Sequence, residues 1–230
     1  MNEAERHVII EEFHEHVKNK EFPCIAAHEA SSKKTLRCFV ADHMACPKDD
    51  HQILNFIYAF VDEFKLSSGG FHSVVIIFKE PRILDENMFD HLLWRRLQAI
   101  SDMDAQRFDF DSRVSSDIGS PNFSYSLKEE AFYVIGLHPA SSRKARQYKY
   151  PVLIFNPHSQ FENLRAENHY SKMQQIVRKR DQLYSGSVNP MLADFGDAPE
   201  VFQYSGRVYE STWQCPLKIN HANIKHHSSA

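Results

Sequence analysis

The chain has 230 residues, of which 42% are hydrophobic, and this is enough apolar material for one sizeable core. That composition excludes disordered, collagen-like and repeat proteins. With 27 basic against 30 acidic side chains there is no positive surplus for a phosphate backbone, so nucleic acid is not expected as a partner. Only 7 glycines are present and no glycine-rich phosphate loop occurs, which argues against a nucleotide site built from backbone amides.

Helices and strands are predicted to alternate along the first half of the chain. Apolar residues at helical spacing predict helices over 3–20, 49–66 and 85–104, and Asp85 is placed to cap the last of these. Strands are predicted over 35–41 and 71–79, the second buried on both faces because it is almost continuously apolar. An ordered polar loop is expected over 105–122.

The second half predicts a cluster of strands followed by helices. Strands are expected over 123–127, 130–137 and 151–156, a basic loop or short helix over 138–149, helical structure in two pieces over 159–184, loops from 185 and a flexible tail from about 218. This order predicts the α/β (mixed α+β) class: a single domain over residues 1–230 with a central mixed sheet flanked by helices.

The four cysteines contain no C-x-x-C pair and do not suggest a disulfide framework. The first residues lack the pattern of a signal peptide, and no apolar stretch is long enough to span a bilayer. We therefore expect a cytoplasmic protein with reduced thiols and no membrane partner.

Two histidines stand where an apolar strand is predicted to stop: His138 after 130–137 and His158 after 151–156. A side chain at a strand end is held by a rigid sheet and can still face a cavity. Imidazole in such a place can act as a general base, a metal ligand or an axial ligand of heme iron. The alternative for each is a histidine that hydrogen-bonds a loop carbonyl.

Three further residues are candidates for cofactor binding. Arg143 and Arg146 are three apart, so on a helical turn they would share a face and could hold a carboxylate or heme propionates; the alternative is a surface salt-bridge face. Cys24 follows the first predicted helix, and its thiolate could ligate heme iron; the alternative is a small buried core residue.

Several short motifs are similar to those of one family, the YqcI/YcgG family. They are Phe22-Pro23-Cys24, His138 through Arg146, Asn156 through Glu162, Arg178 through Asp181, Ser185 through Pro190 and Asp194 through Gly196. The similarity extends from about residue 20 to about residue 217. More narrowly, these motifs resemble the guanitoxin-type branch of heme-dependent N-hydroxylases.

The resemblance implies a heme monooxygenase. Such an enzyme uses dioxygen, with electrons from a reductase or ferredoxin, to N-hydroxylate the guanidino group of an amino acid such as arginine or enduracididine. On that basis His138 is the preferred axial ligand of the heme iron, His158 the second choice and Cys24 the third. Arg143 and Arg146 would pair with the propionates or with the substrate carboxylate.

Other functions remain open from the sequence alone. A non-catalytic heme carrier or sensor could use the same histidines, and a zinc hydrolase could use His138 and His158 with nearby carboxylates. A protein without any cofactor is the third alternative. The expected partners are a small guanidine-containing substrate, dioxygen and an electron donor, and a homodimer is the assembly considered.

Overall fold

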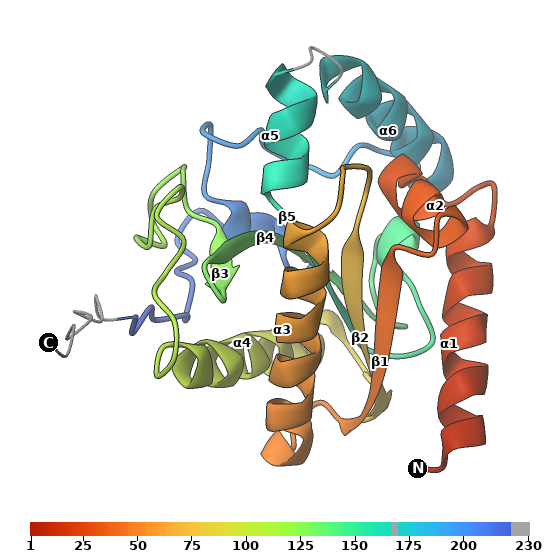
Figure 1. Ribbon diagram of the computed structural model, residues 1–230. Helices are drawn as coiled ribbons and strands as arrows, with labels where there is room; N and C mark the ends of the chain where they lie inside the picture. Colours follow the sequence, from red (N-terminus) through yellow and green to blue (C-terminus); the bar gives the residue numbers. More distant parts are fainter. Residues whose placement is uncertain (167–169, 222–230) are drawn as a thin grey trace, which may run out of the picture.

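The computed structural model describes residues 1–166 and 170–221, and a five-stranded sheet lies at its centre in the order β1-β2-β5-β4-β3 (Figure 1). The strands are β1 (Leu36–His43), β2 (Ser73–Glu80), β3 (Tyr125–Leu127), β4 (Glu130–Leu137) and β5 (Val152–Pro157). β1 and β2 pair in parallel, and the other pairs are antiparallel. The predicted mixed sheet is therefore confirmed.

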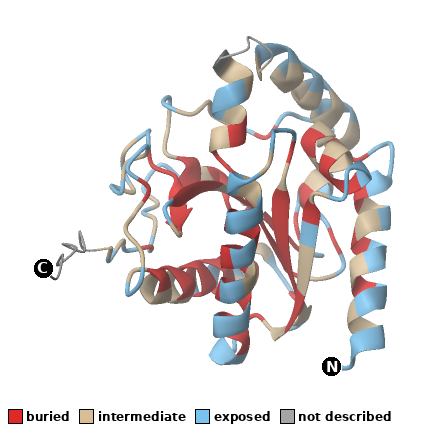
Figure 2. Ribbon diagram, viewed as in Figure 1, coloured by how far each residue is buried: buried red, intermediate tan, exposed pale blue. Residues whose placement is uncertain are grey.

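Helices cover both faces of this sheet (Figure 1). They are α1 (Glu3–Lys18), α2 (Ile25–Ser32), α3 (Asp50–Lys65), α4 (Glu86–Asp104), α5 (Ser159–Ala166) and α6 (Tyr170–Ser185), with short 3-10 helices η1 (Pro47–Asp49), η2 (Lys144–Arg146) and η3 (Glu200–Gln203). α1 and α2 lie on one face, and α3 and α4 lie on the other. The outer sides of α1 and α3 are exposed (Figure 2).

Strand β2 contributes side chains to the apolar clusters on both faces of the sheet. Val74, Ile76 and Phe78 pack with α3 and α4, whereas Val75 and Ile77 pack with α1 and α2. Side chains alternate between the faces of a strand, so a continuous apolar run supplies both faces at once. Full burial of each such side chain contributes about 1.5–3 kcal/mol. The packing of β2 into both clusters confirms the prediction of a strand covered on both faces.

The predicted helices and strands are confirmed, but α2 was not expected. Helix α1 ends at Lys18, and α2 begins directly after Cys24. The Cys24 sulfur accepts a hydrogen bond from the backbone N–H of Ala27 and so caps this eight-residue helix. The predicted cap Asp85 is also confirmed, since its side chain accepts from the N–H of Met88.

Residues 218–221, at the start of the tail predicted to be flexible, make polar contacts with α4. The Lys218 backbone bonds the Gln98 side chain on α4 in both directions, and Asn220 donates to Asp102 at 2.8 Å. His221 lies 2.9 Å from Asp104. Hydrophobicity did not reveal these polar contacts, and residues 222–230 lie outside the described part of the chain. In the ranges that are described, no helix is both long and apolar enough to cross a membrane.

Candidate functional site

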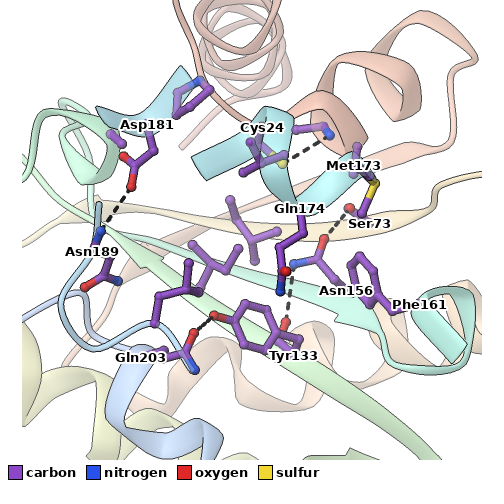
Figure 3. A pocket seen from close by; sticks show the side chains of 18 of the residues that line it. Cys24, Ser73, Tyr133, Asn156, Phe161, Met173, Gln174, Asp181, Asn189 and Gln203 are labelled. Atoms are coloured by element: carbon purple, nitrogen blue, oxygen red, sulfur yellow. Dashed lines mark hydrogen bonds between the residues drawn. The ribbon is translucent and has the colours of Figure 1, made fainter. Parts of the chain in front are cut away.

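A cavity of about 260 Å³ lies on the α1/α2 side of the sheet, between the strands and helix α6. Its walls are mostly apolar and carry a few polar groups, which is the usual makeup of a small-molecule site. The polar and reactive side chains of the lining include Cys24, Tyr133, Arg143, Arg146, Asn156, His158, Glu200 and Gln203. Figure 3 shows part of this lining, drawn from β4, β5, α2, α6 and the loop at Asn189.

The alternation of side chains decides which strand residues reach the cavity. On β4 these are the odd-numbered Tyr133, Ile135 and Leu137, and on β5 they are the even-numbered Ile154 and Asn156. Tyr133 and Asn156 are direct cross-strand partners and therefore share a face. Asn156 accepts from Ser73 at 2.6 Å and donates to the Tyr133 carbonyl, so this part of the floor is held rigidly (Figure 3).

His138 faces away from the cavity. It comes one residue after Leu137, so its side chain points to the other face, where its ring stacks on Phe89 of α4 with centroids 4.2 Å apart. Its Nδ1 atom makes no hydrogen bond within the described residues, and burial lowers the pKa of His138 to about 4. The structure thus separates His138 from His158, which lines the cavity.

Cys24 lies in the cavity wall at the start of α2 (Figure 3). Burial raises the pKa of its thiol. Four groups oppose this effect: the backbone N–H groups of Ala26 and Ala27 and the positive charges of Arg146 and Arg180. Amide donors at a helix N-terminus and nearby cations are the features that stabilise a thiolate in proteins. These four groups offset part of the effect of burial, but the pKa of Cys24 stays raised, so burial favours the neutral thiol.

Arg143 and Arg146 both line the cavity from the η2 region, but their partners differ. Arg143 donates to the carboxylate of Asp181 at 2.5 Å. Arg146 donates only to the carbonyls of Gly136 and Gln203, both at 3.1 Å, and has no carboxylate partner among the described residues. Burial lowers the pKa of Arg146, as expected for a buried cation that lacks a counter-charge.

The cavity lining also includes His158 and Glu200, both buried. His158 Nε2 lies 3.6 Å from Glu200 Oε1, which is too long for a hydrogen bond. Glu200 accepts from the Ser124 hydroxyl at 3.0 Å and from the Tyr204 hydroxyl at 3.4 Å. Burial raises the pKa of Glu200 to about 8 and lowers the pKa of His158 to about 4, so both are neutral near pH 7.

Sequence reasoning therefore found four of the residues that share the cavity: Cys24, Arg143, Arg146 and His158. It missed Glu200, which lies in the region expected to be loops, where no periodic pattern marks a buried acid. No group of three or more His, Cys, Asp or Glu residues that could hold a metal ion occurs in residues 1–166 and 170–221. A heme needs only one such side-chain ligand.

The fold and site together define a mixed α/β protein. One face of its sheet is covered by a continuous apolar core, and the other face borders a cavity whose wall contains Cys24. The chain belongs to the YqcI/YcgG family, whose model matches residues 13–218. It is 27% identical over 210 residues to a protein of Bacillus subtilis (strain 168) described as "Uncharacterized protein YqcI", covering 87% of this chain and 82% of that relative. No solved structure matches the chain.

Proposed function

We propose that the protein is a heme-dependent monooxygenase that N-hydroxylates the guanidino group of an amino acid such as arginine or enduracididine, with Cys24 as the axial ligand. The observation that carries the proposal is the position of Cys24: a thiol capped by helix N–H groups, in the wall of a mostly apolar cavity, beside the unpaired cation Arg146. This places Cys24 ahead of His158 and His138, because His138 does not line the cavity and His158 lies against Glu200.

The residues present fit a heme. Cys24 offers the soft donor, and Arg146 offers the cation that a thiolate or a propionate would need. The volume of the cavity, about 260 Å³, is below the usual range for small-molecule sites. Binding of a heme would therefore require α6 to move away from the sheet. Helix α6 has no buried residue, so the shift would break polar contacts such as Arg143–Asp181 rather than apolar packing.

When bound, heme supplies the activation of dioxygen. The chain itself would hold the cofactor through Cys24, keep water out with the apolar wall of α1 and the sheet, and place the substrate. In the overall reaction one oxygen atom of dioxygen enters an N–H bond and the other leaves as water. Two electrons and two protons must then come from outside, through a reductase or ferredoxin, because no nucleotide motif in the sequence provides them.

The absorption spectrum of protein expressed in heme-sufficient cells tests the cofactor and the ligand together. We expect a Soret band, and a ferrous carbon monoxide band near about 450 nm for thiolate ligation. Cys24→Ser should lose that band. The matched control is Cys38→Ser, because Cys38 also has a pKa raised by burial, to about 12, and does not line the cavity. A spectrum of histidine type that survives in Cys24→Ser would overturn the ligand assignment.

Incubation with NADPH, a ferredoxin and its reductase, and a panel of guanidines tests the reaction. Mass spectrometry should show one product heavier by one oxygen atom. Stoichiometric heme with no hydroxylated product from any guanidine would instead favour the heme carrier or sensor. A colourless protein from heme-sufficient cells would refute both.

A further inference from the structure

We propose that Glu200 and His158 form the receptor for the substrate's guanidinium group, with Glu200 as its counter-charge and His158 Nε2 as a second hydrogen-bond acceptor. The inference rests on the proposed function for the substrate class alone. It assigns a role to two residues that line the cavity, and it does not depend on which residue binds the heme iron.

Glu200 differs from the other carboxylates around the cavity because it has no arginine or lysine partner among the described residues. Asp181 is paired with Arg143 at 2.5 Å, and Asp194 is paired with Arg178 at 2.9 Å. Glu200 receives only the hydroxyl groups of Ser124 and Tyr204, both on the same oxygen, Oε2. Its Oε1 atom, the one nearer His158, therefore has capacity for a donor.

His158 has a matching vacancy. Its Nε2 atom is buried and makes no hydrogen bond within the described residues. The side chain is held in place by Phe195, whose ring centroid lies 4.2 Å from that of the imidazole. In the neutral ring with its proton on Nδ1, Nε2 is an acceptor. Two acceptors, Nε2 and Glu200 Oε1, thus lie 3.6 Å apart with no donor assigned to either.

A guanidinium suits this pair better than an ammonium does. It is planar and carries several N–H donors in a fixed fork, so neighbouring N–H groups can reach two adjacent acceptors at once. It also supplies the positive charge that Glu200 lacks.

The charged groups already near Glu200 do not fill this role. Arg165 on α5 bonds the carboxylate of Glu162 and lies 4.3 Å from the centre of the Tyr170 ring, so it is engaged elsewhere. The Glu162 carboxylate lies 3.6 Å from His158 Nδ1, the ring nitrogen that does not approach Glu200. Without a ligand, burial keeps Glu200 protonated up to a pKa of about 8. A bound cation would therefore displace that proton and lower the pKa of Glu200.

Calorimetric binding of L-arginine and L-citrulline to the purified protein tests the receptor. The two ligands have nearly the same shape, but citrulline carries a neutral urea group. We expect arginine to bind at least about 30-fold more tightly, and Glu200→Gln to remove that preference. Glutamine keeps an acceptor for Ser124 and Tyr204 but loses the charge. The control is Asp90→Asn, a buried carboxyl on α4 that does not line the cavity, and it should keep the preference.

A measurement on the unaltered protein keeps the test decisive even where the variant fails to fold. Arginine binding at pH 6–7 should release about one proton, and arginine affinity should rise about tenfold per pH unit below about pH 8, then level off. Equal binding of arginine and citrulline by the unaltered protein, or an arginine preference that survives in folded Glu200→Gln, would overturn the receptor. These outcomes do not depend on the heme spectrum, so either proposal can fail while the other stands.

Discussion

At Gly136, side chains of helix α4 pack directly against the backbone of strand β4. A Cβ atom there would lie 2.6 Å from Phe89 Cε1 and 3.0 Å from Leu93 Cδ1, so only glycine lets α4 approach β4 this closely. Its carbonyl accepts from Arg146 at 3.1 Å and its N–H donates to the Tyr204 carbonyl at 2.7 Å. The same residue thus fixes the packing of α4 and the position of the cavity's unpaired cation.

We expect Gly136→Ala to destabilise the protein by about 1–3 kcal/mol, because the added methyl group overpacks against Phe89. Urea unfolding at neutral pH measures this change. The double variant Gly136→Ala with Phe89→Leu should lose less stability than the sum of the losses in the two single variants. The leucine side chain, which replaces the phenyl ring, leaves room for the added methyl group. Strict additivity would show that the contact with Phe89 is not the cause.

His138 makes the fold sensitive to acid. Burial lowers its pKa from 6.5 to about 4, so between these values the unfolded chain binds a proton that the folded chain excludes. Its contribution is fully present above about pH 6.5 and is lost as the pH falls toward 4. Replacing it with leucine should flatten the loss of unfolding free energy over this range by about 1.4 kcal/mol per pH unit.

Urea titrations of the unaltered protein and of His138→Leu at several pH values between 4 and 6.5 test this expectation. The control is His91→Leu, at an exposed histidine on α4. If both variants change the slope equally, burial of His138 is not the cause.

At the residue scale, sequence reasoning found more of the site than of its arrangement. The rule that a strand ends at a histidine applies equally to His138 and His158, yet only His158 lines the cavity. The alternation of side chains along a strand distinguishes the two histidines only when the face that borders the cavity is known. Which face that is depends on the helices that pack against the sheet. Glu200 could not be found, since the sequence around it does not indicate that it is buried or that it bonds Ser124, 76 residues earlier in the chain.

At the scale of elements, α6 has an unusual role. It has no buried residue, yet it closes the cavity and positions the segment that carries Cys24. The guanidinium of Arg180 donates to the carbonyls of Lys20 at 2.6 Å and Phe22 at 3.0 Å, which lie four and two residues before Cys24. This helix therefore contributes through polar contacts rather than through apolar burial.

We expect Arg180→Met to expose Cys24 by releasing these two carbonyls, with little change in global stability. Labelling by iodoacetamide, followed by peptide mass spectrometry, should show modification of Cys24 about ten times faster than in the unaltered protein, as about 1.4 kcal/mol of lost restraint would give. Lys179→Met is the matched control, because Lys179 is the exposed neighbour on the same helix. Unchanged labelling in Arg180→Met would assign the restraint to other contacts.

Most helices and strands could be predicted, because a long segment with periodic apolar residues indicates its secondary structure clearly. Helices α3 and α4 and strand β2 show strong apolar patterns and were located within a few residues. Helix α2 was missed because it has only eight residues and only Ala26 and Ala30 as buried apolar side chains, too few to form a periodic signal. Its consequence, the capped thiol of Cys24, was missed with it.

At the scale of the whole molecule, the sheet divides a filled side from a hollow side. The core on the α3 and α4 side is continuous and draws on β1, β2, β3, β4 and β5. The other side has its apolar cluster under α1 and α2 and then opens into the cavity beneath α6. Local stability should follow this division, because segments with few buried side chains open most easily.

Native-state hydrogen exchange should therefore show α6 opening well before α4, in which ten residues are buried. Protein loaded with heme should protect α6 amides relative to the same protein without it, because a bound cofactor would cover the inner side of the helix. Protection of α4 should stay unchanged. Equal protection of α6 in the two samples would place the cofactor elsewhere.

The alternation of residues along β4 and β5 has a consequence for altering this protein. Ile135, Leu137 and Ile154 line the cavity, whereas Val134, Leu153 and Phe155 belong to the filled core on the opposite face. Neighbouring positions on one strand therefore affect different properties: one set shapes the cavity, and the other set stabilises the core. A library confined to the cavity-facing positions could change which ligand the cavity accepts with little effect on thermal stability. A library at the intervening positions would change thermal stability and leave the cavity lining intact.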